Sequence, residues 1–213
     1  AAIDAEDEAA AIALLNGAFD AGLDWADLER AFATAALAHY NGFGHSAIYV
    51  TKAGELIARL GAGAMAPLLR SLAREFVYTT REEYLPEFRG YETALAGWGK
   101  GGNGKSLNTG DLVGLNAAKA MAAVSAHGRQ DPESLYRAVL GMSAHALLHF
   151  DLAVMQRTDG PIADNASWLD VTHGITFSNA ARKLCTKYPD LWPRALLQVA
   201  LQAGRNAGYL DKE

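Results

Sequence analysis

The sequence predicts an all-α fold, in the form of a helical bundle built from two copies of a four-helix unit plus a connecting helix. Three observations support this prediction. Apolar residues recur at intervals of three and four along most of the chain, as on the buried face of a helix. Alternation with a period of two, which marks a half-buried strand, never persists beyond a few residues. The order of the predicted helices in the first half of the chain is also repeated in the second half.

Three helices are expected at the start of the chain. The first covers residues 5–19, where the apolar residues share one face. Asp24 stands in the position of an N-cap for a second helix over residues 25–40. A glycine-rich break follows, and His45 opens a third helix that continues to about Leu60.

A fourth and a fifth helix complete the first half. Pro67 suits the first turn of the fourth helix, because the amide hydrogens of that turn have no partner within the helix. The fifth helix, residues 81–98, is amphipathic and richer in charge, and it connects the two units. A glycine-rich linker at residues 97–106 leads into the second unit.

We expect a single domain, residues 1–213, with an internal duplication that relates residues 5–80 to residues 111–210. In the second copy, residues 111–124 correspond to the first helix, and Asp131 caps the second. Each unit alone would contain only about 75 to 100 residues and a small core. The two units should therefore pack into one intertwined bundle around a pseudo-two-fold axis.

Two pairs of corresponding residues support the prediction of a duplication. His173 lies 128 residues beyond His45, and Pro193 lies 126 residues beyond Pro67. Earlier in the two copies, corresponding residues are only 107 positions apart. The larger separation after that point indicates an insertion in the second copy, at residues 157–169. A loop of this length in a compact helical protein is often functional.

Composition excludes several classes of function. Half of the residues are hydrophobic, and a net charge of -5 without a basic stripe argues against nucleic acid or an anionic membrane surface as a partner. No apolar run reaches the ~20 residues that cross a bilayer. Cys185 is the only cysteine, which rules out an internal disulfide and an all-cysteine metal site and fits the cytoplasm. We expect a small-molecule substrate as the partner, and a homodimer is an allowed assembly.

Five of the six histidines lie near the two corresponding helix junctions, which are expected at one end of the bundle. They are His39 and His45 in the first copy, and His145, His149 and His173 in the second. A histidine at a helix N-terminus feels the positive end of the helix dipole, which favours the neutral imidazole. Because the neutral form can act as a general base, His45 and His173 are the candidate catalytic residues.

The remaining three histidines are the candidate metal ligands. His145 and His149, four residues apart, share one helix face and can bind one ion together with His39. Iron or another transition metal is the expected cofactor class, with haem ligation by one histidine as the weaker alternative. The sequence has no Glu-x-x-His pair of the kind that marks di-iron bundles. Carboxylates that could complete the site are Glu55, Asp151, Asp164 and Asp170. The alternative is that each histidine is a polar cap or a hydrogen-bonded core residue.

Two further patterns concern ligands. Tyr49, Trp168 and Phe177 could line an aromatic substrate pocket, although aromatic residues at helical spacing also form cores. Residues 99–106 (GKGGNGKS) match the phosphate-loop pattern G-x-x-x-x-G-K-S. Such a loop follows a buried strand, whereas this one follows a predicted helix and joins the two copies. A flexible linker is therefore the better interpretation.

Residues 172–181 (THGITFSNAA), followed by residues 194–198 (RALLQ), resemble the C-terminal helical region of questin oxidase-like proteins. Residues 44–49 (GHSAIY) are similar to other histidine-bearing helices of that family. The resemblance implies an all-helical oxidoreductase that acts on an aromatic or polyketide-like substrate. The resemblance also implies that His45 and His173 are the functional residues.

The resulting hypothesis is a soluble oxidoreductase-like enzyme with a histidine-lined pocket between the two repeats, acting on a small apolar or aromatic substrate. The insertion could close over that pocket. The alternative is a noncatalytic helical module that binds a protein or a small ligand and whose histidines are structural.

Overall fold

A computed structural model describes residues 1–102, 104–157 and 166–211 of the chain. In these ranges the ordered elements are α-helices and short 3₁₀ helices, apart from one isolated antiparallel bridge between Phe150 and Leu210. The prediction of an all-α fold is confirmed. No helix in the described part of the chain combines the length and the apolarity needed to cross a bilayer.

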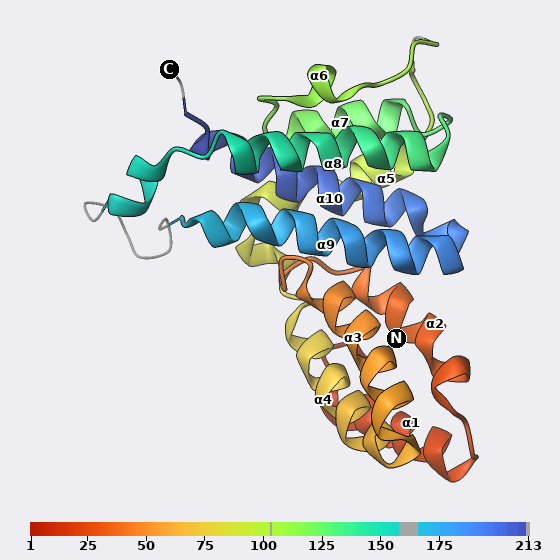
Figure 1. The fold of residues 1–213 in the computed structure, drawn as a ribbon. Helices are drawn as coiled ribbons and strands as arrows, with labels where there is room; N and C mark the ends of the chain where they lie inside the picture. The colour runs from red at the N-terminus through yellow and green to blue at the C-terminus, as the bar shows by residue number, and fades with distance from the viewer. Residues whose placement is uncertain (103, 158–165, 212–213) are drawn as a thin grey trace.

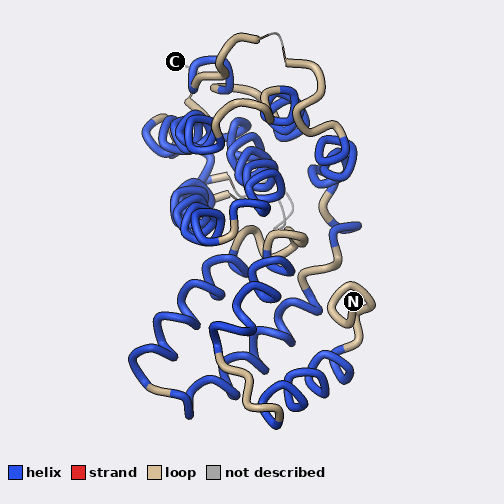
Figure 2. Tube along the Cα trace, turned by 90° about the vertical axis from the view of Figure 1, so that its right-hand side faces the viewer, coloured by secondary structure: helices blue, strands red, loops and turns tan. Residues whose placement is uncertain are grey.

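The first half of the chain forms a group of four helices, which lies to one side of the remaining helices in both views (Figures 1 and 2). Within this group α4 packs against α1 and α3, and α2 packs against α3. The four helices are α1 (Glu8–Asp20), α2 (Trp25–Ala36), α3 (His45–Leu60) and α4 (Met65–Tyr78).

The second half is organised around its last helix, α10 (Trp192–Asn206), which packs against α7, α8 and α9 (Figure 1). Most of its residues are buried, both apolar ones such as Leu197 and Leu201 and a polar row formed by Gln198, Gln202 and Asn206. The other helices of this half are α5 (Tyr91–Ala96), α6 (Thr109–Leu112), α7 (Ala117–Ala126), α8 (Pro132–Leu148) and α9 (Trp168–Lys187).

Local sequence signals explain where several helices begin. The Asp24 side chain accepts a hydrogen bond from the Asp27 amide, and the Asp27 side chain accepts one in return. Asp131 accepts from the Ser134 amide at 2.8 Å, directly before α8. Both predicted N-caps are therefore confirmed. Ser167 caps α9 in the same way.

The two halves meet where α3 packs on α9. Gly44, the residue before α3, has a φ of 87°, in the left-handed region that favours glycine. A Cβ atom at this position would lie 2.2 Å from the Phe177 ring of α9. The glycine-rich break predicted before His45 therefore lies in the contact between the two halves.

Several predicted helix boundaries are wrong. Residues 81–98 do not form one helix, because Pro86 lacks an amide hydrogen and holds the preceding Leu85 in an extended conformation. Two 3₁₀ helices, η2 (Glu82–Tyr84) and η3 (Pro86–Gly90), therefore precede a short α5. The helix expected at 111–124 is divided at Gly114, which has a φ of 79°. The helix expected at 25–40 ends at Ala36, which leaves His39 in a loop.

The structure does not confirm the two-unit organisation. The first half is a group of four helices, whereas in the second, within the described residues, α5, α7, α8 and α9 pack against a central helix, α10, and α6 packs on α8. The internal duplication and its pseudo-two-fold axis therefore stay predictions. The expected insertion falls mostly on residues 158–165, which lie outside the described residues, and Asp164 is among them.

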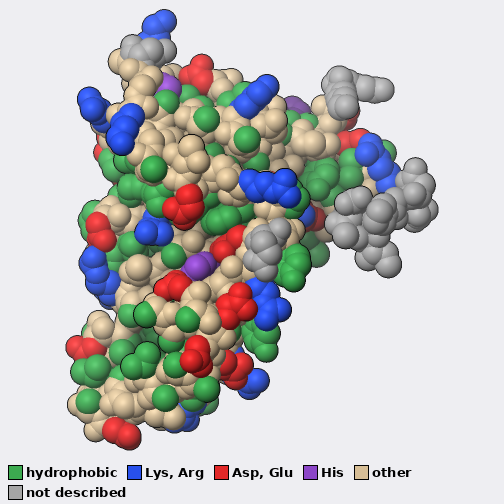
Figure 3. All heavy atoms as spheres, turned by 180° about the vertical axis from the view of Figure 1, so that it is seen from behind, with side chains coloured by type: hydrophobic (Ala, Val, Ile, Leu, Met, Phe, Trp, Pro, Cys, Tyr) green, Lys and Arg blue, Asp and Glu red, His purple; other side chains and the backbone are tan. Residues whose placement is uncertain are grey.

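On the face opposite to that of Figure 1, basic and acidic side chains both occur, and neither sign covers the face continuously (Figure 3).

Candidate functional site

Two of the predicted site residues, His45 and His173, lie against each other. Their ring centroids are 4.0 Å apart, and the ring planes are inclined by 51°. His45 is the first residue of α3, as predicted. His173 was expected to open its helix in the same way, but Ser167 caps α9 and the helix begins at Trp168. His173 therefore stands in the second turn, and the two residues are contacting partners rather than copies at equivalent helix starts.

The ring of His45 is oriented by the loop before α3. Its Nδ1 lies 2.7 Å from the main-chain oxygen of Gly42, an acceptor, so Nδ1 carries the hydrogen. In the neutral imidazole this leaves Nε2 as the basic nitrogen. Because Gly44 has a left-handed conformation and no side chain, the loop can turn tightly enough over Phe177 to present His45 to α9.

His173 presents a buried nitrogen to this site. Its Nε2 is buried and has no hydrogen-bond partner within the described part of the chain. Burial, and next the positive charge of a protonated His45, lower the pKa of His173 below its ordinary value of 6.5, against the opposing effect of Asp170. His173 is therefore held in the neutral form at neutral pH.

Two serine hydroxyls near the pair also have no partner within the described residues. Ser46 Oγ is buried and follows His45 directly in α3. Ser143 Oγ is buried in α8 and faces Gly174, the residue after His173. Buried polar atoms are nearly always hydrogen-bonded, so two such hydroxyls beside the histidine pair are unusual. Sequence reasoning missed both serines, because neither stands in a recognisable motif.

Tyr49 connects the pair to a cavity. Its ring centroid lies 5.5 Å from that of His45, one turn earlier in α3. The same side chain lines a cavity of about 310 Å³ between α3 and α4. The other residues of its lining are Lys52, Ala53, Leu56, Leu68, Ser71, Leu72 and Glu75.

The other two predicted pocket residues have different surroundings. Phe177 is fully buried in the core beneath Gly44, so it packs the two halves together rather than lining an open pocket. Trp168 is the first residue of α9, and half of its side chain is exposed. Of the three predicted aromatic residues, only Tyr49 contacts one of the two histidines in the described structure.

The candidate metal ligands are divided between two places. The rings of His145 and His149 lie side by side at the end of α8, with centroids 4.1 Å apart. His39 instead lies between two carboxylates, with Nε2 3.0 Å from Asp4 and Nδ1 3.1 Å from Glu82. Across residues 1–102, 104–157 and 166–211, no three His, Cys, Asp or Glu side chains are grouped so that they could hold a metal ion.

The two carboxylates around His39 also change its protonation. Burial alone would lower the pKa of His39, but the hydrogen bonds to Glu82 and Asp4 outweigh it and raise the pKa above 6.5. Both ring nitrogens then donate hydrogens to carboxylate oxygens. Sequence reasoning missed Asp4 and Glu82, which lie 35 and 43 residues away and share no motif with His39.

The carboxylates considered as further metal ligands have structural contacts. Glu55 forms ion pairs with Lys52 and Lys183, which lower the pKa of its carboxyl group. Asp151 accepts a hydrogen bond from the Ala153 amide at 2.8 Å. Asp170 completes the cap of α9.

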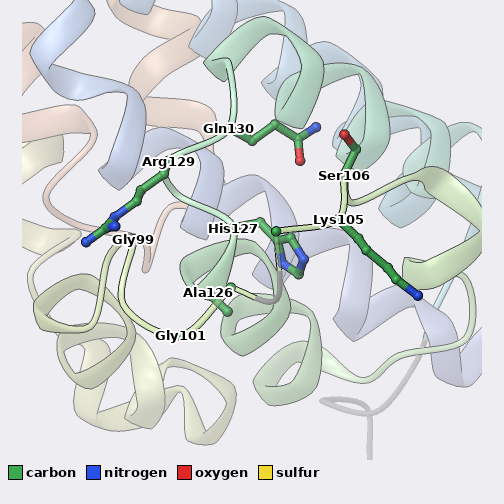
Figure 4. A pocket seen from close by; sticks show the side chains of 10 residues that line it. Gly99, Gly101, Lys105, Ser106, Ala126, His127, Arg129 and Gln130 are labelled. Atoms are coloured by element: carbon green, nitrogen blue, oxygen red, sulfur yellow. The ribbon is translucent and has the colours of Figure 1, made fainter.

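The glycine-rich segment lines a cavity of about 410 Å³ together with Ala126, His127, Arg129 and Gln130 (Figure 4). The segment closes on the C-terminal end of α7, where the Gly99 amide donates to the main-chain oxygen of Ser125 at 2.8 Å. A helix C-terminus carries partial negative charge, the opposite of what a phosphate group requires. The Lys105 and Arg129 side chains also point in different directions (Figure 4). This geometry supports the linker interpretation.

No protein-family model, curated protein or solved structure matches the chain. The resemblance to questin oxidase-like proteins therefore rests on the quoted residues.

Proposed function

We propose that the chain is an oxidoreductase-like enzyme whose proton-transfer site is the pair His45 and His173. The observation that supports this proposal is the contact between two imidazoles from helices far apart in the sequence. The Nε2 of one of them, His173, is buried and has no partner among the residues that the structure describes. Two structural histidines would be expected to have their buried nitrogens satisfied, because an unmade hydrogen bond to a buried group is costly.

Each histidine has a distinct role in the proposal. His45 is the general base: its Nδ1 hydrogen is held by Gly42, so Nε2 is free to accept a proton from the substrate. His173 stays neutral because of burial and the proximity of His45, so the pair carries at most one positive charge. Its Nε2 then contacts the substrate through a hydrogen bond.

The substrate class is inferred from the cavity that Tyr49 lines, although neither His45 nor His173 is among its lining residues. Its lining is mainly apolar, and a volume of about 310 Å³ lies at the lower end of the range for small-molecule pockets. A small aromatic molecule with an ionisable hydroxyl group, a phenol, fits both the cavity and a neutral histidine base. The redox class rests on the family resemblance, and the residues described here supply the proton-transfer step.

The second candidate is a noncatalytic helical binding module. Its support comes from His39, whose two carboxylate contacts are structural. In that case the contact between His45 and His173 is a product of helix packing, and replacing either residue changes stability without affecting ligand binding. For either candidate we propose a cytoplasmic location and a homodimer.

The experiment that tests the enzyme proposal is binding of para-nitrophenol, whose absorbance reports its ionisation. In the variant His45→Asn, the amide nitrogen can still donate to Gly42, but the basic Nε2 is absent. His127→Asn is a matched control, because His127 Nδ1 makes the same kind of contact, 2.8 Å from the main-chain oxygen of Ala123.

We expect His45→Asn to weaken binding of the ionised probe at least ~10-fold, which corresponds to about 1.4 kcal/mol, and His127→Asn to leave it unchanged. Equal affinity in the wild type and both variants would exclude the pair as a phenol-binding site and favour the noncatalytic module.

A further inference from the structure

A second pair of histidines lies away from the proposed proton-transfer site, at the end of α8. His145 belongs to the last turn of the helix, and His149 is its C-cap residue. The ring centroids are 4.1 Å apart and the planes are inclined by only 30°. Apart from this mutual contact, neither ring has a hydrogen-bond or ion-pair partner within the described residues.

The backbone beneath the two rings is fixed from several sides. The His149 amide donates to the main-chain oxygen of His145 at 3.0 Å, and the main-chain oxygen of His149 accepts from the Asp211 amide at 2.8 Å. The bridge between Phe150 and Leu210 follows directly. The two imidazoles are therefore presented by a scaffold that is already ordered, which reduces the entropy lost when both bind one ligand.

We propose that His145 and His149 form a binding site for a divalent transition-metal ion, with Zn²⁺ as the expected occupant. Imidazole nitrogen is a preferred ligand of Zn²⁺, and two histidines four residues apart can reach one ion from the same helix face. The carbonyl groups at the C-terminal end of α8 add partial negative charge near the cation.

Water completes the coordination of this site. Two protein ligands are fewer than the three of a typical catalytic zinc site, so the ion is exchangeable and a coordination position stays open to an incoming donor. The ion also links residues in successive turns, so its binding stabilises the end of α8 against fraying. This site is independent of the pair formed by His45 and His173.

The test is titration of tag-free protein with Zn²⁺, followed by calorimetry. We expect the wild type to bind one equivalent, and His145→Asn or His149→Asn to weaken binding at least ~10-fold, since each variant removes one of two ligands. The variants His127→Asn and His173→Asn are controls and should bind as the wild type does. Circular dichroism of each variant verifies the helical fold.

A second measurement uses only the wild type. Carbethoxylation by diethyl pyrocarbonate, read by peptide mass spectrometry, should be suppressed by Zn²⁺ at His145 and His149 and unaffected at His127. The proposal is overturned if Zn²⁺ gives no heat of binding, if both α8 variants bind with wild-type affinity, or if His173→Asn removes the binding instead.

Discussion

The imidazole rings of His45 and His173 lie 4.0 Å apart, although the two residues are separated by more than half of the chain. The contact exists because α3 packs on α9 through a glycine, and the Phe177 ring occupies the place where a side chain of residue 44 would be. The geometry of the proposed site and the junction between the two halves therefore depend on the same few residues.

Replacement of Gly44 by alanine should lower the free energy of unfolding by more than the strain of the left-handed backbone conformation alone would. Gly44→Ala combines a left-handed backbone conformation with a Cβ atom 2.2 Å from Phe177, and we expect a loss of about 3 kcal/mol or more. Gly22→Ala is the matched control, because its φ is 78° but an added Cβ atom would meet no atom within 4 Å, so a loss of about 1 kcal/mol is expected. Urea unfolding measures both losses, and equal values would contradict the close approach.

Protonation of His173 should oppose folding at acidic pH. Its pKa is lowered in the folded state, so the unfolded chain binds the proton more tightly once the pH falls below the ordinary value of 6.5. The stability of the wild type should therefore decrease as the pH falls from 6.5 through the lowered pKa. His173→Asn should remove this part of the pH dependence, and His127→Asn should retain it. Free energies of unfolding measured at several pH values test the difference.

His39 should show the opposite pH dependence. Its pKa is raised, so the contribution of the protonated ring is fully present below the ordinary value of 6.5 and disappears as the pH rises through the raised pKa. We expect His39→Gln to cost about 1 to 2 kcal/mol in mild acid and much less in alkali. An equal loss at both pH values would mean that the contacts with Asp4 and Glu82 do not depend on a charged ring.

A buried hydrogen bond between the two halves gives a further prediction. The Tyr40 hydroxyl donates to Gln202 Oε1 in α10, and Tyr40→Phe would leave that acceptor buried without its partner. We expect a loss of about 1 to 3 kcal/mol in the free energy of unfolding.

The control for this prediction is Tyr91→Phe. The Tyr91 hydroxyl donates to the main-chain oxygen of Leu37 over 3.3 Å, and Gln198 Nε2 also donates to that oxygen, at 2.8 Å. Since the acceptor keeps a partner, Tyr91→Phe should cost less than Tyr40→Phe in the same chemical denaturation measurement. The reverse order would contradict the assigned hydrogen bonds.

The features that could be predicted from the sequence depend on neighbouring residues. The caps at Asp24 and Asp131 were predictable because each capping side chain bonds an amide three residues later. The start of α3 at His45 was predictable from the glycine before it. Pro86 was a local signal as well, and its effect on the helix expected at residues 81–98 could have been anticipated.

The features that could not be predicted depend on packing between distant segments. The contact of His45 with His173 requires the position of α3 on α9, and the carboxylates around His39 come from two other segments. The contact between His145 and His149 could be predicted from the sequence, because a spacing of four residues is enough to place the two side chains beside each other at one end of a helix.

The central claim, that His45 and His173 form one coupled proton-transfer site, is tested most directly by NMR titration of the His173 ring in the wild type and in His45→Asn. In the wild type, His173 should titrate with a pKa below 6.5, and that pKa should rise in His45→Asn because the neighbouring charge is removed. A His173 ring that titrates at or above 6.5, or whose pKa is the same in both proteins, would contradict the account.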